Sequence, residues 1–499
     1  MITLYWFLLF LLSIYGIHRL HILFLVHTTS PIQERTVKKE PNVLIQVPIF
    51  NEKYVAKRII KSCMDLDWPK ESLFVQILDD STDETTRIIE EIVEDYKQRG
   101  FWIELIHREN RAGYKAGALD VGLQKIQNPN IRSDVDVDFV AIFDADFVPK
   151  SDFLQKSMAY FEDAEIGMVQ SRWGHINREE NVLTRWSAIL LDGHFVLEHS
   201  GRFQSGRIFN FNGTAGIWRI AAIETAGGWQ HDTITEDLDL SYRAAMKGWK
   251  FVYLPHNVAP AELPATTKAF SSQQHRWAKG TIQVAKKLLI PLWKSNVSLK
   301  AKIEGSIHFT SNIAYPMTVL LIALMPYTAP MRSTSWMDGV VFLCTCLSIL
   351  LFYGVALWKI GILGRNWWHI FPTMGLGVGM TFRQSLAVFE GFFGHDRHFV
   401  RTPKKGNESN KGISYLQKQP FPYVSIVEII FATYCVERCF FLIEIETYGT
   451  IPFLLLFAFG FYFVGISSIW EQIGDIMMQQ RNDTREITVG FDKNLPKHP

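Results

Sequence analysis

The stretch Phe139-Val-Ala-Ile-Phe-Asp-Ala-Asp146 decides the fold of the middle of this 499-residue chain. Its five apolar, β-prone residues predict a strand that is buried on both faces, and two aspartates frame the alanine that follows. Alternate residues of an extended segment point the same way, so Asp144 and Asp146 are expected on one side of the chain. The stretch therefore predicts a pair of carboxylates at the end of a buried strand.

Two earlier segments have the same order of strand and polar residues. The runs 43–49 and 73–78 are short and β-rich, and each leads into polar residues. Between 84 and 99 the apolar residues recur at helical spacing, and Ser81 with Glu84 predicts a capping box at the start of that helix. Later elements are expected as a strand at 102–107, a helix at 115–126 and the strand at 139–143.

This alternation predicts an α/β, Rossmann-like fold whose mostly parallel sheet is covered by helices on both faces. Ligands of such sheets lie beyond the carboxyl ends of the strands. The residues expected there are Pro48, Asn51, Glu52, Asp79, Asp80, Asp144 and Asp146. We therefore expect one rim of the sheet to bind a nucleotide and a metal ion.

Asp144 and Asp146 can hold Mg²⁺ or Mn²⁺ beside phosphate oxygens, because these hard cations prefer oxygen ligands. Lys115 follows a glycine-containing loop at the start of a helix, where positive charge and backbone amides can face a diphosphate. In the simpler alternatives, Asp79 and Asp80 only cap a helix and the later aspartates are solvated. The convergence of two strand ends on one rim favours nucleotide binding.

The motif Thr235-Glu236-Asp237 opens an acidic helix. Asp237 is the best candidate for a general base, because a carboxylate can remove a proton from an attacking hydroxyl group. The same residues also fit a simple helix start, in which Thr235 is the N-cap and acids favour the first turn. Taken alone, this segment favours the simple helix start.

The motif Gln273-Gln-His-Arg-Trp277 lies in a stretch, 268–293, that we expect to form a basic amphipathic helix at the membrane surface. Arg276 can neutralise the charge on a departing diphosphate, and Trp277 can stack on a sugar ring. An Arg-Trp anchor at a membrane interface explains the pair without a ligand. The basic loop 399–405 likewise fits either a membrane flank or a gate over the site.

The composition combines a polar middle with apolar ends. Hydrophobic residues make up 48% of the chain and charged residues 20%, and the charged residues concentrate in the middle. The formal net charge of +1 gives no drive toward nucleic acid, so we exclude that class of partner. The five cysteines lack zinc-type spacing and mostly lie in apolar runs, where we expect reduced packing residues.

The apolar segment 4–26 is long enough to cross a bilayer, which needs about 20 residues. No basic residue precedes it and no small-residue cleavage pattern follows it, which favours an anchor over a signal peptide. Basic residues cluster on its C-terminal side, so the next domain is expected in the cytosol. The host membrane is open: a bacterial inner membrane, a plasma membrane or a Golgi-type membrane.

Further apolar runs occur near 309–327, 340–357, 371–393, 424–442 and 451–469. The run 371–393 includes Gly375, Gly377 and Gly379 together with Arg383, Gln384 and Glu390, which suits an interfacial or re-entrant element. We therefore expect roughly five spans, with the basic loop and the C-terminus in the cytosol.

With these motifs in order, the chain resembles the processive membrane glycosyltransferases of family 2, the cellulose-synthase-like group. The resemblance extends from about residue 43 to about residue 405 and rests on the four acidic and Arg-Trp motifs together. It is closest to the plant-type mannan and glucomannan synthases. The residues that carry this closer likeness are Phe211-Asn-Gly-Thr-Ala-Gly-Ile-Trp-Arg219, Ala226-Gly-Gly-Trp229, Gly248-Trp-Lys-Phe251, Glu262-Leu-Pro264 and Gln273-Gln-His-Arg-Trp277.

The resemblance implies a GT-A type domain that inverts the anomeric carbon of a nucleotide sugar, GDP-mannose or UDP-glucose, and extends a β-linked glycan, β-1,4 in particular. It places Asp79 or Asp80 at the base, Asp144 and Asp146 at the diphosphate and its metal, and Asp237 at the acceptor hydroxyl. The other expected site residues are Glu236 beside the base catalyst, Lys115, Gln273 and Arg276 at the donor, and Gly213, Thr214 and Trp277 at the acceptor. A gating segment would correspond to 399–404, with Arg401 and Lys404, although the chain departs from the family pattern there.

The expected organisation is a span at 1–28, a catalytic domain at 40–267, interfacial helices at 268–300, two spans with an interfacial segment at 305–395, a gating-like loop at 396–420, two spans at 421–471 and a polar cytosolic tail at 472–499. Single-sugar transfer to a membrane lipid competes with polymerisation, because ceramide-type lipid glucosyltransferases carry similar motifs. A transporter or scaffold that only binds nucleotide sugars is less well supported, because Asp237 and both D-x-D residues are present. Donor, linkage, acceptor and oligomeric state stay open.

Overall fold

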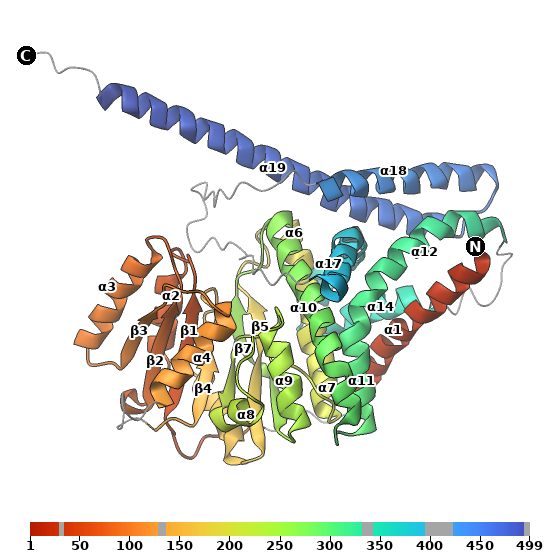
Figure 1. Ribbon diagram of the computed structural model, residues 1–499. Coiled ribbons are helices and arrows are strands. Elements are labelled where there is room, and N and C mark those ends of the chain that lie inside the picture. Colours follow the sequence, from red (N-terminus) through yellow and green to blue (C-terminus); the bar gives the residue numbers. More distant parts are fainter. Residues whose placement is uncertain (29–33, 128–135, 332–342, 395–422, 494–499) are drawn as a thin grey trace, which may run out of the picture.

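The computed structural model describes residues 1–28, 34–127, 136–331, 343–394 and 423–493. Its polar part is a three-layer domain on a seven-stranded sheet with the order β3-β2-β1-β4-β6-β5-β7 (Figure 1). The strands are β1 (Val43–Ile49), β2 (Leu73–Asp79), β3 (Ile103–His107), β4 (Phe139–Ile142), β5 (Ile166–His175), β6 (Gly216–Arg219) and β7 (Lys250–Ala261). Of these seven strands, β6 runs antiparallel to its neighbours and the others pair in parallel, which confirms the predicted, mostly parallel sheet.

Both faces of the sheet are apolar, as expected for a sheet buried between helices. In β1, Val43, Ile45 and Val47 face one hydrophobic core and Leu44 faces the other. The first core is completed by α2 (Ala56–Met64), α3 (Thr85–Gln98) and α5 (Phe153–Met158), and the second by α4 (Tyr114–Gln127), α8 (Ile220–Thr225) and α9 (Glu236–Met246).

The register of the sheet brings its polar strand ends to one level. Ile49 at the end of β1 is paired with Asp79 at the end of β2, and Asp79 is paired with His107 at the end of β3. Because these strands are parallel, the loops that follow them leave from the same rim. The rim predicted from the sequence is therefore present.

The start of α3 differs from the prediction, and the capping box of Ser81 and Glu84 is wrong. The Ser81 hydroxyl accepts a hydrogen bond from the backbone N–H of Asn51 at 2.8 Å. Asp83 accepts the backbone N–H of Thr85 at 2.9 Å instead. Ser81 is used to tie the loop after β2 to the loop after β1, which holds the two rim loops together.

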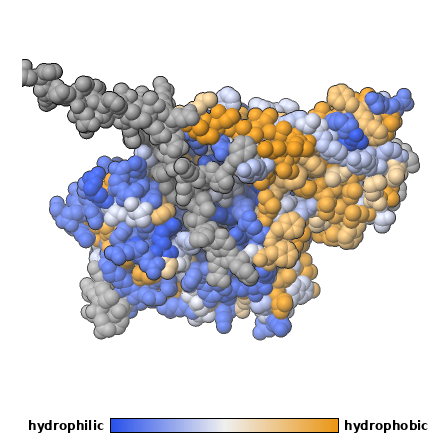
Figure 2. Space-filling view, turned by 45° about the horizontal axis from the view of Figure 1, so that its top comes forward, coloured by the Kyte–Doolittle hydropathy of each residue, from blue (hydrophilic) through white to orange (hydrophobic). Residues whose placement is uncertain are grey.

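The second part of the molecule is helical and packs against one side of the α/β domain (Figure 1). Its main helices are α1 (Ile2–Thr28), α10 (Thr267–Lys294), α11 (Leu299–Thr310), α12 (Ala314–Thr328), α14 (Ser348–Lys359), α16 (Ile370–Gly379), α17 (Thr381–Phe393), α18 (Tyr423–Glu444) and α19 (Ile451–Lys493). Hydrophobic residues gather on the surface of this part, whereas the α/β domain is largely hydrophilic (Figure 2). Such an outward-facing apolar surface associates the protein with a membrane.

Within the described residues, three helices are long and apolar enough to cross a membrane: Ile2–Thr28, Leu299–Met331 and Ile451–Met477. The expected number of about five spans and the domain boundaries stay predictions. The loop 396–420 and its basic residues lie outside the described residues.

The expected basic amphipathic helix is present as α10, and most of its apolar side packs on protein. Val284 and Leu288 belong to a hydrophobic cluster with residues of α9 and α11. Lys279 is buried and forms an ion pair with Glu390 of α17 at 3.0 Å. Near its C-terminal end, Ile290 is 65% exposed. Helix α10 is therefore the shared wall between the α/β domain and the apolar helices.

Helices α16 and α19 cross at close range through three glycines. A Cβ atom on Gly379 would lie 2.2 Å from the carbonyl oxygen of Gly460, and a Cβ on Gly460 would lie 2.0 Å from that of Gly375. Small residues are typical of helix contacts in membranes, because they let the backbones approach. Two of the glycines predicted to mark an interfacial element, Gly375 and Gly379, are therefore packing residues for α19, whereas Gly377 has no heavy atom within 4 Å of its Cβ position.

We predict that Gly460→Ala lowers the free energy of unfolding in detergent by about 2 kcal/mol or more, because the added methyl overpacks a backbone contact. Gly474→Ala, in the same helix, is the control, since no heavy atom lies within 4 Å of its Cβ position. That change should leave stability unchanged or raise it by up to about 1 kcal/mol through helix propensity. Equal effects of the two substitutions would contradict the close crossing.

Candidate active site

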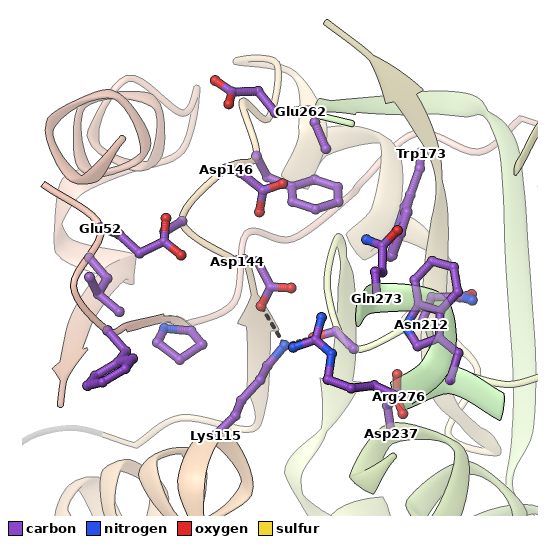
Figure 3. A pocket seen from close by; sticks show the side chains of 18 of the residues that line it. Glu52, Lys115, Asp144, Asp146, Trp173, Asn212, Asp237, Glu262, Gln273 and Arg276 are labelled. Carbon is purple, nitrogen blue, oxygen red and sulfur yellow. Dashed lines mark hydrogen bonds and ion pairs between the residues drawn. The ribbon is translucent and has the colours of Figure 1, made fainter. Parts of the chain in front are cut away.

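A cavity of about 220 Å³ opens at the predicted rim. Its walls come from the loops after β1, β2 and β4, the loop before β6, the first turn of α9 and the N-terminal half of α10 (Figure 3). The residues predicted from the sequence that line it are Pro48, Glu52, Asp80, Lys115, Asp144, Asp146, Gly213, Glu236, Asp237, Gln273, Arg276 and Trp277. The fold thus brings together motifs that lie up to about 230 residues apart in the chain, from Pro48 to Trp277.

Lys115 lies at the centre of the cavity floor. Its ammonium group donates to the Asp144 carboxylate at 2.5 Å and to the Gly213 carbonyl at 2.8 Å (Figure 3). Burial disfavours the charge on Lys115, but Asp144 and Glu236 outweigh burial and raise the pKa of Lys115 above its usual value. Lys115 is therefore a fixed cation, as a site for a diphosphate requires.

Thr214 is a support for the site and not part of the cavity wall. Its hydroxyl accepts the backbone N–H of Asp144 at 2.8 Å, and its side chain is fully buried. This bond connects the loop after β4 to the loop before β6. The predicted contact of Thr214 with an acceptor stays a prediction, and the geometry gives it a structural role.

Asp237 lies beside Glu236 at the start of α9, where both residues are partly exposed to the cavity. Burial, followed by the negative charge of Glu236, raises the pKa of Asp237 to about 7. Burial also raises the pKa of Glu236. A carboxylate whose pKa is near neutrality is suited to general base catalysis, because it can accept a proton at physiological pH.

Gly213 packs directly against the two charged groups that the site depends on. Its φ angle is +80°, and a Cβ atom there would lie 3.0 Å from Oδ2 of Asp237 and 3.4 Å from Nζ of Lys115. Glycine is needed for both the backbone conformation and the close approach. The loop before β6 thereby brings Asp144, Lys115 and Asp237 into one group.

The structure distinguishes the two aspartates at the end of β2. Asp79 is fully buried, where it accepts the Ser81 backbone N–H at 3.0 Å and the His107 Nδ1–H at 2.8 Å. Asp80 lines the cavity, and Arg108 donates to its two oxygens at 2.7 and 2.6 Å. Of the two candidates for a base contact, only Asp80 therefore faces the site.

Helix α10 delivers Gln273, Arg276 and Trp277 to the cavity from one of its faces, as helical spacing allows. Burial outweighs the nearby Asp144 and Glu236 and lowers the pKa of Arg276 to about 10, which leaves the guanidinium charged at neutral pH. The helix can come this close because Gly280 packs on Thr235: a Cβ there would lie 2.5 Å from Cγ2 of Thr235.

Comparison with known proteins identifies the family of this chain. Residues 41–280 match the model of a family described as glycosyltransferase like family 2. Glucomannan 4-beta-mannosyltransferase 1 of Oryza sativa subsp. japonica is 38% identical over 385 residues, which cover 74% of this chain and 70% of the relative. The chain belongs to glycosyltransferase family 2. The resemblance inferred from the ordered motifs is thus confirmed.

Other relatives carry similar names. Glucomannan 4-beta-mannosyltransferase 9 of Arabidopsis thaliana is 34% identical over 391 residues, which cover 76% of this chain and 70% of that protein. Probable glucomannan 4-beta-mannosyltransferase 9 of Oryza sativa subsp. japonica is 40% identical over 328 residues, 62% of this chain. The chain spans only 59% of the length of that relative.

Among solved structures, the glycosyltransferase chain is similar to the mannosyltransferase PcManGT from Pyrobaculum calidifontis, which was solved with GDP-Man and Mn²⁺. The TM-score is 0.52 at 17% sequence identity, and the match covers 77% of this chain and 98% of that one. At this identity the match shows a shared fold, which confirms the predicted GT-A type architecture.

Some predicted site residues lie elsewhere, and some cavity residues were not assigned from the sequence. Asn51 does not line the cavity; its side-chain oxygen accepts the Thr82 backbone N–H at 2.8 Å. Arg401 and Lys404 lie outside the described residues. The unassigned cavity residues include Arg111, Trp173, Asn212 and Glu262. Asn212 and Glu262 lie in two of the motifs that carry the resemblance to mannan synthases, and that position could have identified them as site residues.

We predict that Gly213→Ala lowers glycosyl transfer on the order of a hundredfold, because the methyl group displaces Asp237 and Lys115. Gly228→Ala is the matched control: its φ is +72°, and no heavy atom lies within 4 Å of its Cβ position. Both changes should cost about 1–2 kcal/mol of stability for the left-handed backbone, and only the first should remove activity. Equal activities of the two variants, measured with a radiolabelled donor, would contradict the proposed contact.

Proposed function

We propose that this glycosyltransferase extends a β-1,4-linked mannan or glucomannan with inversion, uses GDP-mannose as donor, and passes the product into the membrane helices. Polymer synthesis is favoured over transfer of a single sugar by one observation: a second cavity, of about 330 Å³, adjoins the first. The two cavities share Trp173, Asn212, Asp237 and Trp277 in their walls. A chain held in the second cavity would therefore have its end at Asp237.

The lining of the second cavity favours a glycan acceptor over a lipid. Tyr15, His18 and Arg19 of the N-terminal helix contribute polar groups to it, within the apolar part of the molecule. The rings of Trp173 and Trp277 lie 6.5 Å apart at its entrance, where sugar rings can stack. Ionisable residues inside membrane helices mark a polar pathway by default, and acyl chains would gain nothing there.

The chemistry follows from the residues around the first cavity. Asp237 removes the proton of the acceptor hydroxyl, which attacks the anomeric carbon of the donor from the side opposite the diphosphate. Lys115 and Arg276 neutralise the negative charge that develops on the departing diphosphate. One base and a set of cations suffice for inversion, since no covalent intermediate has to be resolved.

Asp144 and Asp146 fit a divalent metal ion, Mg²⁺ or Mn²⁺. Both line the first cavity, and Figure 3 shows their side chains pointing into the same space. The described residues hold no group of three or more His, Cys, Asp or Glu arranged as a metal site. Two carboxylates completed by phosphate oxygens are a common ligand set for Mg²⁺ in nucleotide sites. When bound, the metal would offset diphosphate charge.

Two findings support the choice of donor and product. The relatives above are named as glucomannan 4-β-mannosyltransferases, and the structural neighbour was solved with GDP-Man and Mn²⁺.

Basic residues after the N-terminal helix support a cytosolic location for the catalytic domain, where nucleotide sugars are available. UDP-glucose is the second donor to test, because a glucomannan also contains glucose.

We expect purified protein with Mn²⁺ to convert labelled GDP-mannose into a long glycan that β-1,4-mannanase degrades. Asp237→Asn should lower this transfer by on the order of 10²–10⁴-fold, because it removes the base, while GDP binding is kept. Asp136→Asn, in an exposed loop away from the cavity, is the control and should be active. A product of one sugar on a co-purified lipid would favour the lipid glycosyltransferase function instead.

The pKa of Asp237 sets the expected pH dependence. The base works only when ionised, so kcat/KM should fall about tenfold per pH unit below a pH of about 7. Activity is thus lost on acidification, because the raised pKa leaves the carboxyl protonated there. A kcat/KM that stays flat down to pH 5.5 would remove Asp237 as the base.

A further inference from the structure

One wall of the second cavity is formed by a helix of unusual geometry. Helix α6 (Val182–Asp192) continues without a break into a π-helical segment, Gly193–His199, and then into α7 (Ser200–Gln204). Such π segments are rare and occur frequently at functional sites. Here the segment contributes His194 and Glu198 to the wall of the second cavity.

His194 connects this helix to the active-site loop. Its Nδ1 lies 2.9 Å from Oε2 of Glu198, and its Nε2 lies 3.1 Å from Nδ2 of Asn212. A carboxylate only accepts and an amide nitrogen only donates, so these partners assign the proton to Nδ1 and a lone pair to Nε2. Glu198 therefore fixes the tautomer that His194 needs to accept a hydrogen bond from Asn212.

Glu198 is itself held in its charged form. Burial opposes ionisation, but Arg202 and the hydrogen bond from His194 outweigh it and keep the pKa of Glu198 below its usual value. Arg202 in turn donates to Glu304 at 2.9 Å, and Glu304 also contacts His18 of the N-terminal helix at 2.9 Å. The orientation of His194 is thus set by a network that reaches the membrane anchor.

Asn212 connects this hydrogen-bond network to the active-site cavity. It lines both cavities and directly precedes Gly213, which packs against the Asp237 carboxylate. Its backbone N–H donates to Oε1 of Gln170 at 3.0 Å, so the main chain is fixed independently of the side chain. The amide group is left for His194 to hold, at the point where an acceptor sugar would enter from the second cavity.

A purely structural role for His194 fits the exposure of the side chain less well. Its side chain is 26% exposed, whereas His199 in the same segment is fully buried against Asn210. A packing histidine would be expected to resemble His199. His194 borders the second cavity while its two ring nitrogens already pair with Glu198 and Asn212, so it can act on a ligand there by holding the Asn212 amide in place.

We propose that His194, oriented by Glu198, is an acceptor-positioning residue: it holds the Asn212 amide against the terminal sugar so that one hydroxyl of a polyhydroxylated acceptor points at Asp237. This inference rests on the proposed transfer function and adds to it a residue that acts only on the acceptor. Loss of His194 leaves the donor site intact, so water can replace the misplaced hydroxyl as the attacking group.

The test compares two fates of GDP-mannose, incorporation into glycan and release as free mannose, with mannotetraose as the added acceptor. His194→Ala should raise the ratio of free to incorporated mannose about tenfold and raise the KM for mannotetraose by a similar factor, as the loss of one well-placed hydrogen bond allows. The Kd for GDP and the melting temperature should match those of the unsubstituted protein. His194→Gln, whose amide oxygen can accept from Asn212, should stay within about threefold.

His256→Ala removes an exposed histidine from β7 and is the matched control. If His194→Ala fails to fold, Glu198→Gln gives the same test, with a smaller shift of the ratio expected. An unchanged ratio, or a parallel loss of transfer and hydrolysis, would overturn the positioning role. Failure of the unsubstituted protein to transfer mannose at all would overturn the proposed function, and the inference with it.

Discussion

The ammonium group of Lys115 is the contact on which the active site depends. It joins Asp144, which follows β4, to Gly213, which precedes β6. Gly213 in turn packs against Asp237. Without this cation, several carboxylates would face each other in a partly buried cavity, where like charges repel strongly. A partly buried pair of this kind adds little to stability, but it fixes the position of each partner. The site is therefore organised by charge before any ligand binds.

Close backbone approaches at glycines fix the positions of the helices in the apolar part. Glycines allow α10 to reach Thr235 and allow α16 to cross α19, so the catalytic motifs and the apolar helices share α10 as one wall. Glu304 adds a polar connection, because it contacts both His18 of α1 and Arg202 of α7 while it is almost fully buried. Hydrogen bonds therefore connect the N-terminal helix to Arg202 in the wall of the second cavity.

The sequence predicted the strand ends well because local patterning determines them. A buried strand followed by Asp144 and Asp146 has only one outcome in a parallel sheet, which is a carboxylate pair at the rim. The hydrogen-bond partners of Ser81 and Asp79 were harder to predict, because a helix cap and a loop contact use the same polar groups. The choice between them depends on Asn51 in the loop after β1 and on His107 at the end of β3.

By itself, the sequence determined the α/β alternation, the four motifs and their order, and hence membership of glycosyltransferase family 2. The tertiary structure decided which groups of these motifs face the cavity: Asp80 and not Asp79, and Asp144 supported by Thr214. It also decided that His194 contacts Asn212 in the wall of a second cavity. The physical reason is that strand and helix patterns are local in the chain, whereas burial and hydrogen-bond partners depend on contacts between distant segments.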